Sequence, residues 1–266
     1  MAADSGRIPP GATGGAGVMP ETISVIGTGR FGVFWGQALS ACYPVMFYDT
    51  DESCREKVHG LGDWADLESC LKQSFIFLTI PISEIAEFLR QYGQKIKLGS
   101  IILDCASVKI KVAEWFAQYL PPDVYYALSH PLFGPDSARQ GLKGHQITLM
   151  PGRIPFNRYR KLVDLFSQEL SLQVINLGPE EHDRLMAFNL SLIHLLGRTC
   201  HGIDLERVPL MMDSLRKLNG ISRVVMNDSE QLFRDFFNFN PYSLEVCRKF
   251  SRVFEAILQR FSDPGG

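Results

Sequence analysis

Short apolar runs alternate with longer amphipathic segments over the first two thirds of the chain. The short runs are rich in Val, Ile, Phe and Tyr, and several are apolar throughout, which is typical of strands buried on both faces of a parallel sheet. The longer segments carry apolar residues at helical spacing. Strands are predicted at residues 22–26, 45–48, 75–80, 101–103, 124–128 and 147–150, and helices between them at 31–41, 82–92 and 109–119. This βαβ order predicts an α/β fold with a Rossmann-type, doubly wound, mostly parallel sheet.

The pattern changes at Gly178. Before it, a helix is predicted from about Asn157 and an edge strand at 172–176, and after it no further strand is predicted. Helices are expected beyond this point at 180–200, 208–225, 229–237 and 243–261. Their apolar faces are too wide for lone solvated helices. We therefore expect an all-helical C-terminal domain over 179–266 that shares apolar surface with a second copy, giving a homodimer.

Composition argues against several classes of protein. The formal net charge of -2 gives no general field for attracting nucleic acid. No apolar run reaches the roughly 18 residues of a membrane span, and residues 1–20, mostly Gly, Ala and Pro, are expected to be a disordered tail. The six cysteines lack the paired spacing of a zinc site or a redox dithiol. We therefore expect no metal site, no membrane partner and a cytoplasmic protein with reduced thiols.

A glycine-rich turn lies between the first predicted strand and the first predicted helix. Gly27 permits the tight turn, Gly29 lets backbone amides approach a pyrophosphate, and Gly32 allows close packing of helix on strand. The positive end of the helix would face the phosphates. The turn therefore predicts a dinucleotide-binding domain over residues 21–178, with these candidate contacts: Gly27, Thr28, Gly29, Arg30, Phe31 and Gly32.

An acidic residue ends the second predicted strand at the distance that this fold requires. The carboxylate of Asp49 can accept hydrogen bonds from the ribose hydroxyls of NAD, whereas the 2′-phosphate of NADP would meet Asp49 and Asp51. NAD is therefore favoured over NADP. Thr79 and Pro81 lie at the end of the strand predicted at 75–80 and are expected along the ribose and nicotinamide side of the cofactor.

Two further segments end strands on the same carboxyl edge, where ligands bind in open α/β sheets. They are Asp104-Cys105-Ala106-Ser107-Val108-Lys109 and Ser129-His130-Pro131-Leu132-Phe133-Gly134-Pro135. The second resembles the His-Pro-Met-Phe-Gly-Pro segment of prephenate and arogenate dehydrogenases, and the first resembles their Asp-x-x-Ser-Val-Lys segment. Glu181-His182-Asp183, His194 and Asn240-Pro241 extend the resemblance, which covers about residues 22 to 260.

The resemblance implies NAD-dependent oxidative decarboxylation of prephenate to 4-hydroxyphenylpyruvate, or of arogenate to tyrosine. The substrate carries a ring hydroxyl on the carbon that loses hydride, and its proton must leave as the carbonyl develops. A neutral imidazole can accept that proton near pH 7. His130 is the candidate base, and Ser107 is expected to hydrogen-bond the same hydroxyl or to fix the ring.

The charged substrate also needs a cation. The resemblance places Arg223 at the side-chain carboxylate, which an arginine can hold through two parallel hydrogen bonds. Arg216 is the competing choice on the same helix. His194 and Lys109 are further candidate substrate contacts. The choice between prephenate and arogenate stays open.

Two other functions compete with this interpretation. A β-hydroxyacid dehydrogenase has the same domain order but uses a lysine in the first helix of its second domain, and residues 182–200 contain no lysine. A non-catalytic NAD-binding sensor would keep the glycine turn without turnover. The presence of both Ser107 and His130 argues against the sensor.

Overall fold

The computed structural model describes residues 22–262, and these form two compact units. The first contains the chain up to Ala106 and Val112–Gly178, and the second contains Ser107–Lys111 and the chain from Pro179 onwards. The tail expected at residues 1–20 lies outside the described residues.

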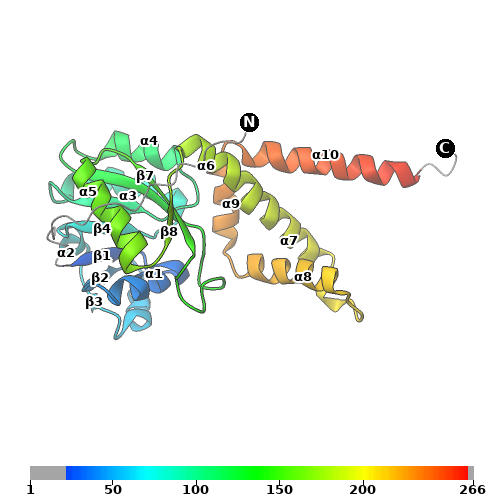
Figure 1. Cartoon of the computed structure of the whole chain (residues 1–266), viewed down its shortest axis with the longest axis horizontal. Helices are drawn as coiled ribbons and strands as arrows, with labels where there is room; N and C mark the ends of the chain where they lie inside the picture. The colour runs from blue at the N-terminus through cyan, green and yellow to red at the C-terminus, as the bar shows by residue number, and fades with distance from the viewer. Residues whose placement is uncertain (1–21, 263–266) are drawn as a thin grey trace. The chain divides into compact units, whose positions relative to one another are not determined.

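The first unit is built on one eight-stranded sheet in the order β3-β2-β1-β4-β5-β6-β7-β8 (Figure 1). All neighbouring strands are parallel except β6 and β7, which are antiparallel. The strands are β1 Ile23–Ile26, β2 Val45–Tyr48, β3 Asp63–Trp64, β4 Phe75–Leu78, β5 Ile101–Asp104, β6 Tyr125–Pro131, β7 Gln146–Pro151 and β8 Gln173–Ile175. The predicted fold class is confirmed.

Helices cover both faces of this sheet, because successive strand residues point to opposite sides. Ile23 and Val25 of β1 pack in one apolar cluster with α1 and α5, and Ile26 packs in the other with α2, α3 and α4. The central strands β1, β4 and β5 are buried along their whole length, which explains their continuous apolar sequence. The helices are α1 Arg30–Ser40, α2 Leu67–Leu71, α3 Ile82–Tyr92, α4 Ile110–Tyr119 and α5 Phe156–Asp164.

The second unit is helical apart from its loops. One long helical stretch runs through α6 Pro179–Met186, the π-turn η4 Ala187–Leu192 and α7 Ile193–Gly202. It is followed by α8 Asp213–Met226, α9 Glu230–Phe239 and α10 Ser243–Ser262. Gly197 lets α7 approach α8 closely: a Cβ there would collide with Val225, and the Ser222 hydroxyl donates to the Gly197 carbonyl over 2.8 Å.

A few elements differ from their prediction. The helix expected from residue 208 begins at Asp213, because the chain bends at Pro209 and Leu210 before it. The short elements β3, α2 and the 3-10 helix η1 Glu52–Val58 were not expected. Within residues 22–262, no helix is long and apolar enough to cross a membrane.

Candidate active site

The glycine turn has the backbone geometry that a pyrophosphate requires. Gly27 has a φ of +103°, and a Cβ there would lie 2.8 Å from the Thr79 carbonyl carbon. A Cβ on Gly32 would collide with the carbonyl oxygen of Gly27. Gly29 is the N-cap of α1, and a Cβ at Gly29 would meet nothing within 4 Å. The first amides of α1 thus face open space with no side chain capping them, which is the arrangement that binds phosphate.

The carboxylate of Asp49 is fixed beside this turn. Its Oδ2 accepts from the backbone amide of Thr28 over 2.5 Å and from the Thr28 hydroxyl over 3.0 Å. Its Oδ1 accepts from the amide of Asp51 over 3.0 Å. A carboxylate offers about four lone-pair positions, so these three bonds orient Asp49 and leave acceptor capacity for a ribose hydroxyl. The turn and Asp49 together fit a dinucleotide.

The remaining cofactor candidates support the turn in different ways. The Thr79 hydroxyl donates to the Gly27 carbonyl over 2.6 Å, and Pro81 is the N-cap of α3. Phe31 stacks on Trp35 with ring centroids 6.0 Å apart. Arg30 forms an ion pair with Asp136, 2.6 Å long, which joins the glycine turn to the segment that follows His130.

His130 lies near the end of β6 and is 8% exposed. The strand end that carries it is tied to β5 by a buried carboxylate. Asp104 accepts from the amide of Ser129 over 3.2 Å and from the amide of Ala106 over 3.1 Å. The Ser129 hydroxyl also donates to the Asp104 carbonyl over 2.5 Å. Asp104 therefore fixes the backbone just before both catalytic candidates, His130 and Ser107.

Ser107 is almost buried, at 8% exposure, and its Oγ has no hydrogen-bond partner within the described part of the chain. Buried hydroxyls are normally paired, and an unpaired one loses its solvation without compensation. A substrate hydroxyl would provide the missing partner.

Lys109 lies in a fully buried cluster of the second unit. Asp183 accepts from the backbone amides of Lys109 and Ile110 over 2.8 and 3.0 Å, and His182 Nδ1 lies 2.8 Å from Asp183 Oδ1. Desolvation, with the charge of Lys109, lowers the pKa of His182 to about 3. Desolvation raises the pKa of Asp183 to about 6, although its bonds to the two amides oppose the rise. This cluster holds residues 107–111 against the start of α6.

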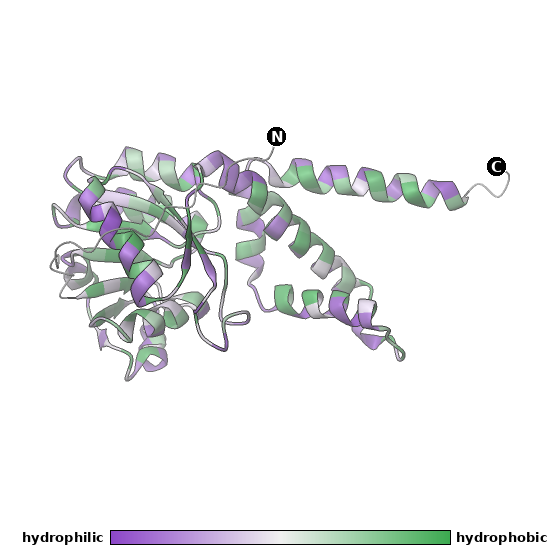
Figure 2. Ribbon diagram, viewed as in Figure 1, coloured by the Kyte–Doolittle hydropathy of each residue, from purple (hydrophilic) through white to green (hydrophobic). Residues whose placement is uncertain are grey.

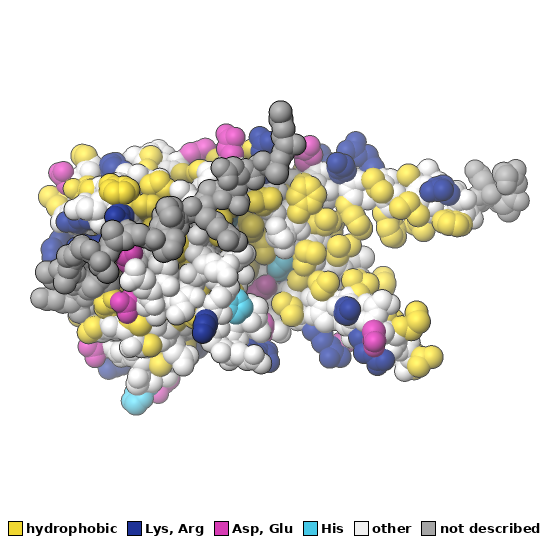
Figure 3. Space-filling model, viewed as in Figure 1, with side chains coloured by type: hydrophobic (Ala, Val, Ile, Leu, Met, Phe, Trp, Pro, Cys, Tyr) yellow, Lys and Arg dark blue, Asp and Glu magenta, His cyan; other side chains and the backbone are white. Residues whose placement is uncertain are grey.

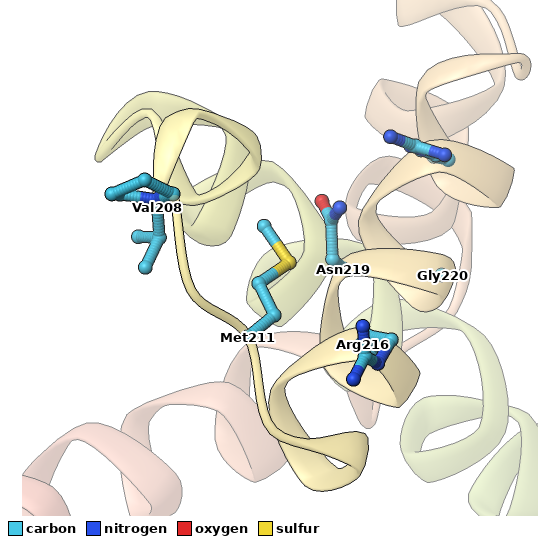
Figure 4. Close-up of a pocket in the computed structure, with 7 residues that line it drawn as sticks. Val208, Met211, Arg216, Asn219 and Gly220 are labelled. Carbon is cyan, nitrogen blue, oxygen red and sulfur yellow. The ribbon is translucent and has the colours of Figure 1, made fainter.

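The two arginines that compete for the substrate carboxylate line one cavity. Arg216 and Arg223 lie two turns apart on α8, with Asn219 and Gly220 between them, and the cavity has a volume of about 420 Å³. Val208, Pro209 and Met211 form its apolar side. Figure 4 shows Arg216 and Asn219 on α8 and Met211 on the segment before it. Arg216 Nε also lies 3.3 Å from Asp213, whose charge competes for it.

His194 lies on α7 and is 3% exposed. Its Nε2 lies 3.4 Å from a carboxylate oxygen of Asp228, rather than bonding to a backbone carbonyl as an ordinary helical histidine would. Among residues 22–262 there is no cluster of His, Cys, Asp or Glu suited to a metal ion.

Sequence reasoning assigned no role to three acidic residues of these sites. Asp104 is the first residue of the Asp-x-x-Ser-Val-Lys segment, and its position at a predicted strand end was the signal in the sequence. Asp136 follows the His-Pro-x-Phe-Gly-Pro segment directly, but its partner Arg30 is distant in sequence. Asp228 lies 34 residues after His194 in a helix connection, and nothing local in the sequence links the two.

Comparison with known protein families gives one match within the chain. Residues 40–157 match the family described as prephenate dehydrogenase, nucleotide-binding domain. This match covers β2 to β7 and includes both strand-end segments, although it begins after the glycine turn.

Curated relatives extend the similarity. Arogenate dehydrogenase 1, chloroplastic, of Arabidopsis thaliana is 26% identical over 245 residues, covering 88% of this chain and 38% of that protein. Arogenate dehydrogenase 2, chloroplastic, of the same organism is 23% identical over 255 residues, covering 88% of this chain and 68% of that protein. The chain thus spans little more than a third of the first relative and about two thirds of the second.

The fold also occurs in a solved structure. Prephenate dehydrogenase from Aquifex aeolicus, in complex with hydroxyphenyl propionate and NAD+, superimposes with a TM-score of 0.69 at 16% identity. The similarity covers 93% of this chain and 94% of that chain. It therefore includes the helical unit as well as the sheet.

Proposed function

We propose that this chain, which is similar to prephenate and arogenate dehydrogenases, catalyses the NAD-dependent oxidative decarboxylation of prephenate or arogenate. The observation that carries the proposal is the sheet edge of the first unit. There, the glycine turn with Asp49 and the strand end with His130 both follow the carboxyl ends of parallel strands. The function is the formation of the aromatic ring in tyrosine biosynthesis.

The cofactor is NAD. When bound, NAD supplies the acceptor for the hydride. The first amides of α1 hold the pyrophosphate, and Asp49 accepts hydrogen bonds from the ribose. Asp49 and Asp51 oppose a 2′-phosphate by charge repulsion, which disfavours NADP.

His130 accepts the proton of the ring hydroxyl as the carbonyl forms, because a neutral imidazole is a suitable base near pH 7. The hydroxyl of Ser107 hydrogen-bonds the same oxygen and thereby gains its missing partner. Loss of the ring carboxylate as carbon dioxide then leaves an aromatic ring, which makes the overall reaction effectively irreversible. His194 and Arg223 contact the rest of the substrate, and Arg223 holds the side-chain carboxylate. Lys109 was expected to contact the substrate as well, but its side chain is fully buried.

The direct test incubates purified protein with NAD and either prephenate or arogenate while the absorbance of reduced nicotinamide is followed. We expect absorbance to appear with at least one of them. His130→Asn should lower turnover by roughly a hundredfold or more with little change in NAD affinity, whereas His59→Asn, at an exposed position, should not. A protein that only gains thermal stability with NAD and never reduces it would be a sensor.

We further propose that residues 21–178 bind the dinucleotide and that 179–266 bind the substrate and form a homodimer. Every residue from Ser251 to Phe261 is exposed, yet α10 is amphipathic (Figure 2). Val253, Phe254, Ile257 and Leu258 are each about half exposed and recur at helical spacing. Figure 3 shows hydrophobic side chains gathered along one side of this helix. A second copy of the chain would cover them.

Light scattering tests the dimer. The wild type should have twice the mass of one chain at micromolar concentration. Phe254→Glu with Ile257→Glu should give a monomer, and Glu255→Ala on the same helix should stay dimeric. A monomeric wild type would refute the dimer.

The cellular environment of the chain is inferred from its thiols. Within the described residues no disulfide joins any of the six cysteines, Cys42, Cys54, Cys70, Cys105, Cys200 and Cys247. Mostly packed thiols outside disulfides fit a reducing cytoplasm, and fractionation of cells expressing the protein would test this location.

A further inference from the structure

The two ring nitrogens of His194 have different surroundings. Nε2 lies 3.4 Å from Oδ2 of Asp228, at the connection between α8 and α9. Nδ1 is buried and has no hydrogen-bond partner within residues 22–262. Buried ring nitrogens are normally paired, so the hydrogen-bond partner of Nδ1 has to come from another molecule.

Aromatic packing fixes the orientation of this ring. The His194 ring stacks on Phe233 with centroids 6.1 Å apart and planes 18° apart, and it meets the edge of Phe236 at 4.9 Å. Because both contacts involve α9, rotation of the ring would disturb two apolar neighbours. The ring therefore keeps Nε2 towards Asp228 and Nδ1 in its unpaired position.

The position of the ring proton follows from these contacts. An ionised carboxylate can only accept, so the nitrogen beside Asp228 is the one that carries hydrogen. A second proton on Nδ1 would place a buried donor where no acceptor lies, whereas a buried lone pair is the less costly unpaired group. The favoured tautomer of the ring thus has its proton on Nε2.

We propose that Asp228 is a positioning residue that keeps the proton of His194 on Nε2, so that Nδ1 is an acceptor for an N–H donor of the substrate. This inference rests on the proposed function and adds the chemistry of the group that His194 recognises. The donor is an ammonium on the substrate side chain, because the single hydrogen of the ring hydroxyl is accepted by His130. A keto or carboxylate oxygen would place two acceptors against each other.

The connection that carries Asp228 is itself held in place. Arg198, one turn after His194 on α7, donates to the carbonyls of Asp228 and Ser229 over 3.4 and 3.5 Å. It also pairs with Glu230 over 2.7 Å, and its guanidinium lies 4.4 Å from the ring centre of Phe233. The helix α7 therefore carries both His194 and Arg198, and Arg198 holds Asp228 in place beside His194.

The first experiment reads the protonation of His194 without any turnover. Protein labelled with 15N in its histidines gives separate NMR signals for Nδ1 and Nε2 of each ring, and His194→Asn identifies the signals of His194 by their loss. We expect Nε2 of His194 to carry the proton at neutral pH, and Asp228→Asn to shift the ring towards a mixture of both tautomers. A proton on Nδ1 in the wild type would overturn the inference even if the enzyme proves active.

The second experiment is a double-mutant cycle on the Michaelis constants. Asp228→Asn should raise KM for the aromatic precursor about tenfold and leave kcat and the KM for NAD nearly unchanged. It should add nothing in a His194→Asn background, because it acts through that residue. Asp204→Asn is the matched control, since Asp204 is an exposed acid of the same unit paired with Arg207 at 3.5 Å. An additive effect of Asp228→Asn would mean that it only stabilises the helix connection and would overturn the inference.

The donor is tested by comparing substrates. We expect the loss to occur with the amino-bearing substrate and not with the keto-bearing substrate, because only the former carries the ammonium that Nδ1 accepts from. A loss with neither substrate, or an equal loss with the keto-bearing substrate, would overturn the inference. Absence of turnover with both substrates would refute the proposed function and leave the NMR result intact.

Discussion

Ser129 donates two hydrogen bonds to Asp104 across the ends of β5 and β6, one from its backbone amide and one from its hydroxyl. Asp104 accepts the Ser129 amide over 3.2 Å, and the Ser129 hydroxyl donates to the Asp104 carbonyl over 2.5 Å. Because Asp104 is fully buried, neither bond is replaced easily by water. The pair determines where the backbone places the following residue, His130.

We predict that Asp104→Asn lowers the free energy of unfolding by about 1–3 kcal/mol, since its amide cannot accept from both Ser129 and Ala106. Urea denaturation at neutral pH measures this change. Glu68→Gln is the control, because Glu68 is an exposed acid paired with Lys72 and should change stability by well under about 1 kcal/mol. An equal loss in both variants would contradict the role of Asp104.

Replacement of Asp49 should separate the two cofactors. Asp49→Asn weakens the hydrogen bonds to the ribose hydroxyls, and bonds to a charged group contribute about 1.5–3 kcal/mol. The KM for NAD should rise roughly tenfold to a hundredfold, while use of NADP changes much less. Steady-state kinetics with both cofactors measure the effect, and Asp66→Asn, an exposed cap of α2, is the control. Equal losses with both cofactors would contradict the assignment.

The buried pair His182 and Asp183 predicts a particular pH dependence of stability. The pKa of His182 is about 3 in the folded chain and its ordinary value is 6.5, so its contribution is complete above pH 6.5 and is lost as pH falls towards 3. His182→Asn keeps a donor for Asp183 without this titration. From pH 7 to pH 5 the wild type should lose about 2 kcal/mol relative to the variant.

Urea unfolding of both proteins at the two pH values measures that difference. The pKa of Asp183, raised to about 6, gives a dependence of opposite sign, but it is present in both proteins. His201→Asn, at an exposed position, should follow the wild type. Parallel pH profiles of the wild type and His182→Asn would show that His182 is not held neutral.

Arg223→Ala should remove the partner of the substrate carboxylate. Losing a charge-assisted pair of hydrogen bonds costs about 2–4 kcal/mol, or roughly 30-fold to 1000-fold in kcat/KM. The loss should fall on the KM for the aromatic precursor, because the contact is present in both ground and transition states. Arg216→Ala on the same cavity should have a smaller effect, since Arg216 is paired with Asp213. A larger loss in Arg216→Ala would contradict this assignment and would show that the substrate carboxylate binds at Arg216, two turns away on α8.

The local sequence was sufficient to predict most strands of the sheet and the glycine turn. The strands β1, β4 and β5 are buried and apolar along their whole length, so their composition indicates their position in the centre of the sheet. The strand β3 consists only of Asp63 and Trp64, which is too short to show any periodicity. The π-turn η4 could not be predicted either, because its residues are ordinary helix formers.

The site was only partly predictable for a related reason. Asp49 and His130 stand next to strand ends and carry their own signal, and the family resemblance, confirmed by the comparisons, supplied Ser107. The contacts of Lys109 with Asp183, and of His194 with Asp228, join residues far apart in sequence. Such contacts depend on tertiary packing, so no local pattern indicates them.

The most direct test of the proposed reaction counts its products. A substrate labelled in its ring carboxylate is incubated with the protein and NAD, and released carbon dioxide and reduced nicotinamide are measured in the same sample. The proposed reaction gives the two in a one-to-one ratio at every time. Reduced nicotinamide without carbon dioxide would indicate a simple alcohol oxidation and would contradict the account.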